Sequence, residues 1–304
     1  MLTELKINPR PPFSFEQTIY SHGWVNLLPN SWDMESRAFS RVEQLQSGKV
    51  VLLTITGNTS VQKPEVFINV RSEKQLLEKD SKQIIHMVNH MLRIDEDLSG
   101  FYELCQKHGG RWLKALTGAG RLLRSPTLFE DVIKTICTTN IQWGGTKRMV
   151  NELVETFGAS FPGNPERKAF PTAKSIAALG FEEFDRMVRL GYRSRYVHEC
   201  AAASADGSLD LDGLQKSNLE TSDLKKELLK IKGIGNYAAA TLLMLLGHYD
   251  ELPIDSVFKE FVSKKYFPGK KYSEKKALSI YRRWGNWKHL AYWFDLWQGL
   301  NEDI

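Results

Sequence analysis

Residues 228–243 read Leu-Leu-Lys-Ile-Lys-Gly-Ile-Gly-Asn-Tyr-Ala-Ala-Ala-Thr-Leu-Leu, and this stretch decides the fold. The pattern predicts an amphipathic helix, a tight turn at Gly233-Ile234-Gly235 and a second, apolar helix that is buried. The two glycines permit positive φ and a close approach to the backbone. Free N–H groups and the helix dipole at the start of the second helix favour an anion such as a phosphate. An ordinary corner between two core helices is the other interpretation.

The periodicity around this stretch divides the chain in two. Residues 97–304 are helical in pattern, which predicts a mostly α-helical domain with the helix–turn–helix segment at about 221–247. Residues 1–96 contain apolar alternating runs at 37–45, 49–56 and 65–70, which predict strands. We therefore expect an α+β N-terminal domain with an antiparallel sheet.

Composition excludes several classes of protein. The 304 residues are 42% hydrophobic and 25% charged, which is typical of a soluble globular protein. The three cysteines, Cys105, Cys137 and Cys200, are scattered, so we expect no disulfide framework, no four-cysteine iron–sulfur cluster and a reducing compartment. The N-terminus lacks a signal-peptide pattern, and no apolar segment is long enough to span a bilayer. We expect a monomer without a membrane partner, located in the cytoplasm or nucleoid of a prokaryote or in a eukaryotic nucleus.

Asp255 is the candidate for chemistry. It lies 20 residues after Gly235 and directly before a predicted helix. Aspartate is a common N-cap residue, so a purely structural role is one interpretation. A carboxylate held ionised at this place could also stabilise an oxocarbenium-like sugar or activate a water molecule.

Positive charge follows Asp255 directly. Residues 259–288 contain ten Lys or Arg against Glu260 and Glu274, a net charge of +8 in a chain whose total is +5. A charge run is usually a solvated helical face. Beside a hairpin that favours anions, we expect a surface that contacts phosphates.

The hairpin and Asp255 together resemble the helix–hairpin–helix (HhH-GPD) DNA glycosylase superfamily, between its alkylpurine and 8-oxoguanine branches. Three further segments are similar to the same family: 129–140, 190–197 and 284–293. The resemblance implies an N-terminal domain like that of the TATA-binding protein, followed by a helical glycosylase domain.

The resemblance also implies roles for single residues. Asp255 would be the catalytic carboxylate, and Tyr192 would wedge into the base stack while Asn140 and Arg193 face the base left unpaired. A phosphate beside the lesion would be held by the backbone N–H groups of Gly233, Gly235 and Ala238. A structural monovalent cation, the one cofactor we expect, would be bound by the carbonyls of Leu229, Ile231 and Ile234.

Departures from the family pattern carry information too. Bifunctional members have a lysine nucleophile where this chain has Tyr237, so no Schiff base can form there. Lys230 and Lys232 are better placed to contact the DNA backbone. Gly145 replaces the arginine that reads an opposing cytosine, and Val257 replaces a histidine, which weakens specificity for that base.

An aromatic residue at 237 is similar to the alkylpurine branch. An N-alkylated purine is cationic, so its pocket needs aromatic faces and one carboxylate more than it needs acid assistance. For each tryptophan below, core packing is an equally ordinary role. The pocket candidates are Tyr237, Trp143, Trp24 and Trp284.

We therefore predict a monofunctional DNA glycosylase of base excision repair. It would bind damaged double-stranded DNA, flip out a base, with an alkylated purine as the expected substrate, and hydrolyse its N-glycosidic bond with Asp255. Two alternatives stay open: a non-catalytic helix–hairpin–helix DNA-binding protein, and a bifunctional glycosylase/lyase for oxidised purines that uses a displaced lysine.

Overall fold

The computed structural model describes residues 1–301, with side chains to residue 296. The chain forms two compact units, each assembled from two stretches. Unit 1 comprises residues 1–97 and 117–215, and unit 2 comprises residues 98–116 and those from 216 onward. The sequence pattern divided the chain near residue 97. One stretch does end there, but residues 117–215 belong with the N-terminal sheet.

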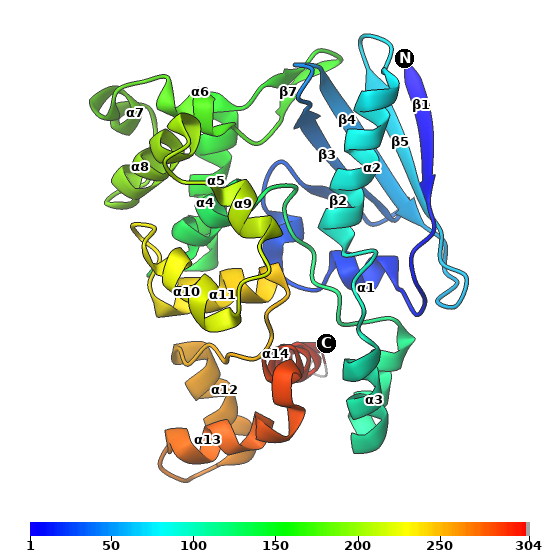
Figure 1. Ribbon diagram of the computed structural model, residues 1–304, viewed down its shortest axis with the longest axis vertical. Helices are drawn as coiled ribbons and strands as arrows, with labels where there is room; N and C mark the ends of the chain where they lie inside the picture. Colours follow the sequence, from blue (N-terminus) through cyan, green and yellow to red (C-terminus); the bar gives the residue numbers. More distant parts are fainter. Residues whose placement is uncertain (302–304) are drawn as a thin grey trace. The chain divides into compact units, whose positions relative to one another are not determined.

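The core of unit 1 begins with an antiparallel five-stranded sheet in the order β1-β5-β4-β3-β2 (Figure 1). The three predicted strands are β3, β4 and β5. The edge strands β1 and β2 were not predicted. The bounds are β1 (Leu2–Ile7), β2 (Ser31–Asp33), β3 (Ala38–Gln44), β4 (Val50–Gly57) and β5 (Val66–Ser72).

Helices complete unit 1, together with a short hairpin that was not predicted and lies in a break between two predicted helices. The hairpin, β6 (Ser160–Phe161) and β7 (Asn164–Lys168), buries Phe161 and Ala169 against Val42 and Leu52 of the sheet. The helices are α1 (Phe15–Ile19), η1 (Gly23–Asn26), α2 (Glu78–Leu92), α4 (Leu128–Thr138), α5 (Trp143–Phe157), α6 (Ala173–Ala177), α7 (Phe181–Met187), α8 (Arg193–Asp206) and α9 (Leu211–Lys216).

A buried ionic network ties the sheet of unit 1 to α4. Arg41 on β3 is fully buried, and its Nη2 lies 2.9 Å from a carboxylate oxygen of Glu130. Lys134 contacts the other Glu130 oxygen at 2.6 Å, while Glu43 and Asn30 satisfy the remaining guanidinium donors. Each buried charge therefore has partners, which a low-dielectric interior requires.

Unit 2 is helical. Trp284 packs with its ring 4.4 Å from that of Trp112 and 5.9 Å from that of Phe101. No helix in the described part of the chain is long and apolar enough to cross a membrane. The elements are α3 (Ser99–His108), η2 (Gly110–Thr117), α10 (Thr221–Leu229), α11 (Asn236–Leu246), α12 (Ser256–Tyr266), α13 (Glu274–Tyr281), η3 (Arg282–Trp287) and α14 (Lys288–Asn301).

Asp295 on α14 is the polar centre of unit 2. Its fully buried carboxylate contacts Arg111 of η2 at 2.8 Å and Lys265 of α12 at 3.1 Å. The hydroxyl of Tyr281 on α13 donates to it at 2.8 Å, and the Tyr266 hydroxyl on α12 also donates. One carboxylate thus joins four elements of the unit.

We expect Asp295→Ala to lower the free energy of unfolding by about 3 kcal/mol, because it removes the shared acceptor of buried donors. Partial exposure of Arg111 and Lys265 keeps the effect below that of a fully buried pair. Urea unfolding of the whole protein measures it. Asp185→Ala, at an exposed position of α7, is the control. Equal stability of the two variants would contradict the central role of Asp295.

Candidate active site

The hairpin between α10 and α11 has the geometry of an anion site. Gly233 adopts φ +87°, which a side chain would strain. The first helical bond of α11 runs from the Ala239 N–H to the Gly235 carbonyl at 2.9 Å, so the N–H groups before it have no partner in the helix. A Cβ built on Gly235 would meet nothing within 4 Å. The N–H groups of Ala238 and its neighbours therefore lie at the start of α11, with open space beside Gly235.

The end of α10 presents carbonyl oxygens, which suit a hard cation. The Ile231 oxygen accepts the Ile234 N–H at 3.0 Å, and its second lone pair is left for a ligand. Together with the carbonyls of Leu229 and Ile234, this donor set fits the expected monovalent cation. Such an ion would fix the turn and would take no part in bond cleavage.

The two hairpin lysines differ in surroundings. Lys230 forms an ion pair with Glu227 at 2.6 Å, and both side chains are largely exposed. Lys232 is exposed on the turn itself. An exposed pair of this kind is worth little in stability, so Lys230 can exchange Glu227 for a phosphate at small cost.

Asp255 is the N-cap of α12, and its carboxylate accepts the Phe258 N–H at 2.7 Å. The capping interpretation is therefore confirmed. Burial raises the pKa of Asp255, outweighing the backbone N–H bonds and Lys259, which act in the opposite direction. Ile254 and Val257, on either side, are exposed apolar side chains. The site is a half-buried carboxylate with an apolar rim.

Two tyrosines lie within the field of Asp255. Burial, and then the Asp255 charge, raises the pKa of Tyr237, which is 43% exposed at the start of α11. Burial and the same charge also raise the pKa of Tyr292 on α14. The Tyr292 ring packs edge-on against Phe258, 5.0 Å between centroids. Tyr292 was not singled out from the sequence, although it lies in the 284–293 segment that resembled the family.

A second cluster forms in unit 1 at the end of α4. Asn140 has a left-handed backbone (φ +47°), and its Nδ2 donates to the Tyr192 hydroxyl at 3.3 Å. Tyr192 is 54% exposed. The predicted wedge and its neighbour are thus brought together on one surface.

Arg193 requires a correction, because it is only 5% exposed instead of facing outward. It donates to the Thr139 carbonyl, and its guanidinium lies 4.4 Å from the centroid of the Tyr192 ring. These contacts hold the arginine beneath the wedge. Burial alone would raise the pKa of Tyr192, but bonds to Thr139 and Asn140 and the charge of Arg193 lower it.

Apolar side chains flank this second cluster. Trp143 is 38% exposed and lies against Gly23, where a Cβ would come within 2.7 Å of its ring. Ile141, also exposed, occupies the space that a side chain at Gly145 would need, since a Cβ there would be 2.4 Å from its Cδ1. The sequence did not indicate a role for Ile141, because no charged residue lies in the turn that contains it.

Trp24 and Trp284 are also corrections to the predicted pocket. Both are buried within their own units. The Trp24 Nε1 donates to the buried Asp131 at 2.7 Å, and Trp284 belongs to the aromatic core described above. Core packing, the alternative weighed for each tryptophan, applies to these two.

Comparison with known proteins identifies the family. Residues 133–286 match the model described as HhH-GPD superfamily base excision DNA repair protein. The chain belongs to the HhH-GPD superfamily. The match contains the hairpin, Asp255 and the second cluster of Asn140 and Tyr192, so the predicted family is confirmed.

Relatives of this HhH-GPD protein fall in two groups. A DNA-3-methyladenine glycosylase of Bacillus subtilis is 27% identical over 223 residues, covering 72% of this chain and 73% of the relative. The solved 3-methyladenine DNA-glycosylase of Archaeoglobus fulgidus superposes with TM-score 0.73 at 18% identity, covering 96% and 98%. A Clostridium acetobutylicum 8-oxoguanine glycosylase/lyase, solved with DNA containing cytosine opposite 8-oxoguanine, has TM-score 0.69 at 17% identity, covering 100% and 99%. The predicted fold class is confirmed.

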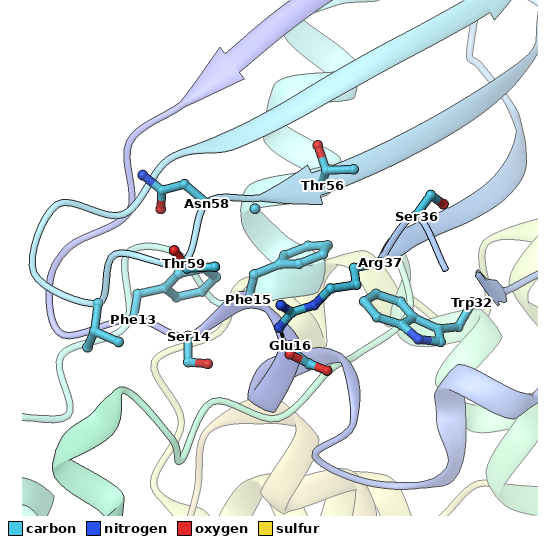
Figure 2. A pocket seen from close by; sticks show the side chains of 12 residues that line it. Phe13, Ser14, Phe15, Glu16, Trp32, Ser36, Arg37, Thr56, Asn58 and Thr59 are labelled. Carbon is cyan, nitrogen blue, oxygen red and sulfur yellow. Dashed lines mark hydrogen bonds and ion pairs between the residues drawn. The ribbon is translucent and has the colours of Figure 1, made fainter. Parts of the chain in front are cut away.

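A separate hollow of about 260 Å³ lies in unit 1 (Figure 2). Phe15 and Trp32 form its aromatic wall, and Arg37 is paired with Glu16 at its rim. None of the residues predicted for the site lines it.

The hairpin glycines make a testable contrast. We expect Gly233→Ala to destabilise the protein by about 1 kcal/mol or more, because alanine is strained at positive φ. Gly235→Ala should leave stability unchanged within about 0.5 kcal/mol, since its φ of −93° is ordinary and its Cβ meets open space. Urea unfolding compares both with Gly180→Ala, another open position. Equal losses at 233 and 235 would show that the turn is not as described.

Proposed function

We propose that this HhH-GPD protein is a monofunctional DNA glycosylase that releases alkylated purines from double-stranded DNA. The observation that carries the proposal is the half-buried Asp255 carboxylate beside the exposed Tyr237, at the place where lyases carry lysine. The 3-methyladenine glycosylases among its relatives support the substrate class.

The chemistry follows from this pair. In an N-alkylated purine nucleotide the base is already cationic, so the C1′–N bond breaks with its electron pair leaving on the neutral base. The sugar becomes an oxocarbenium ion, which the Asp255 carboxylate stabilises. Water then adds to C1′ and loses a proton, which gives an abasic site. The π face of Tyr237 attracts the cationic base before cleavage.

Binding of the duplex would use both clusters. The N–H groups at the start of α11 suit a phosphate, and Gly235 leaves room for it to approach. Tyr192 would fill the gap left by the flipped nucleotide, with Asn140 beside it. The monovalent cation at Leu229, Ile231 and Ile234 belongs to the same proposal, as a clamp on the hairpin.

We expect Asp255→Asn to reduce base release from a 3-methyladenine or 7-methylguanine duplex by roughly 10²–10⁴-fold. Asparagine still caps α12 through its amide oxygen, so folding and DNA binding should persist. Single-turnover release of free base is the measurement. Glu260→Gln removes one charge from the same helix and is the control; wild-type release by Asp255→Asn would refute the mechanism.

Strand cleavage separates the monofunctional proposal from the lyase alternative. With Tyr237 in place of lysine, we expect nicks at the lesion only after alkali, and no borohydride-trapped adduct. Tyr237→Lys, tested beside the wild type, shows whether the site would support a Schiff base. Nicking by the wild type without alkali would require a lysine elsewhere in the site.

The pH dependence of base release should reflect the ionisation of Asp255. Burial disfavours its charged form and raises its pKa, so the active carboxylate is lost on acidification at a higher pH than for an ordinary aspartate near 3.9. Single-turnover rates, corrected for spontaneous depurination, should therefore fall on acidification at a higher pH than an unperturbed aspartate would give. A flat profile down to about pH 4 would contradict a raised pKa.

The base opposite the lesion should matter little. A bidentate arginine discriminates between bases by about 1–3 kcal/mol, and Ile141 with Gly145 offers no such donors. Rates for one lesion paired with each of the four bases should agree within about fivefold. A strong preference for cytosine would mean that another side chain reads that base.

A further inference from the structure

Five exposed lysines gather where α12 ends and α13 begins. We call this set the lysine corner: Lys264, Lys270, Lys271, Lys275 and Lys276. Within residues 261–280 the sole acid is Glu274, while the sixth lysine, Lys265, is held by Asp295. Among the described side chains, those of residues 1–296, no ion pair engages a member of the corner.

The backbone of the corner is well defined. Phe267-Pro268-Gly269-Lys270 closes a turn with the Lys270 N–H donating to the Phe267 carbonyl at 3.0 Å. Gly269 in the third position has φ +72°, the positive φ that a type II turn requires, and proline is common in the second position. The lysines are thus presented from a fixed turn and two helix ends.

The chemistry of the corner fits a nucleic-acid backbone. No large hydrophobic side chain is exposed between residues 258 and 296, so the corner lacks the apolar anchors that a lipid surface or a protein interface requires. Lysine acts as a point charge without bidentate geometry. It therefore suits contacts with DNA phosphates that do not depend on the base sequence.

The distance between the lysine corner and Asp255 follows from the length of α12. Asp255 caps the start of α12, and the corner lies around the end of this helix at Tyr266, 11 residues later. At 1.5 Å per residue this separates the two by about 16 Å. If this length is laid along the axis of a duplex, it equals about five base pairs at 3.4 Å each.

We infer that the lysine corner is a second duplex-DNA contact, which binds backbone phosphates about five base pairs from the flipped nucleotide. The inference rests on the proposed function, because the distance of about five base pairs is counted from a lesion bound at Asp255. It goes beyond that function because it assigns a separate surface, which adds affinity on long duplexes and does not enter the chemical step.

The test replaces all five corner lysines with glutamine. The control replaces five exposed lysines of unit 1, namely Lys63, Lys74, Lys79, Lys82 and Lys174. Dissociation constants are measured against salt for an undamaged and a 3-methyladenine duplex of 25 base pairs, and for a hairpin-stabilised lesion duplex with three base pairs on either side. Single-turnover base release at saturating enzyme is measured in parallel.

We expect the corner variant to lose about 0.9 from the log–log salt slope for each contact removed, at least about 1.8 in total, on the long duplexes only. Base release and short-duplex affinity should stay at wild-type values, and the control should retain the full slope. Ethylation of phosphates about five positions from the lesion should weaken the wild type and not the corner variant.

An unchanged salt slope, or an equal loss in the control, would overturn the inference. Binding of the corner to anionic vesicles with no change on DNA would also overturn it, in favour of a membrane partner. Should no lesion be excised at all, the proposed function fails. The undamaged 25-base-pair duplex would then still decide whether the corner contacts DNA.

Discussion

The buried carboxylate of Asp295 is the interaction on which the C-terminal unit depends. A charge without water must be matched on every side, and here the match comes from η2, α12 and α13 at once. Arg41 does the same in unit 1, where it joins β3 to α4. Each unit therefore contains a buried charge whose partners come from distant parts of the chain. A purely apolar core would hold the helices together but would not fix their register so narrowly.

The starts of α11 and α12 in unit 2 differ in what satisfies their free N–H groups. At α12 the side chain of Asp255 accepts the Phe258 N–H, so the half-buried carboxylate is held in one orientation. At α11 no side chain caps the helix, and Gly235 leaves its N–H groups approachable. One helix start thus carries a fixed negative charge and the other attracts one. This pairing suits a nucleotide whose phosphate and sugar need opposite partners.

Sequence was most informative where a local rule decides the structure. The Gly-Ile-Gly turn, the helix start at Asp255 and the central strands β3 to β5 all follow from spacing and periodicity, and all are present. The family and fold class followed from the same residues. The misses have tertiary causes. Nothing local marks β6 and β7 as strands, because they form only by packing Phe161 against β3 and β4. The guanidinium of Arg193 is buried against the Tyr192 ring, which the spacing of residues in the sequence cannot indicate. Trp24 is buried and Trp143 is exposed, a difference that depends on which residues of the folded chain pack against each ring.

The interleaving of the two units along the chain has a consequence for biosynthesis. Residues 98–116 emerge from the ribosome early, yet the remainder of unit 2 begins only at residue 216. At the usual pace of translation, Arg111 precedes its partner Asp295 by roughly 10–40 s. During that interval unit 1 can complete itself through residue 215, while η2 and Trp112 still lack the helices that cover them. The nascent chain therefore carries an uncovered aromatic segment between two finished halves of a domain, which is the kind of surface that chaperones bind during synthesis.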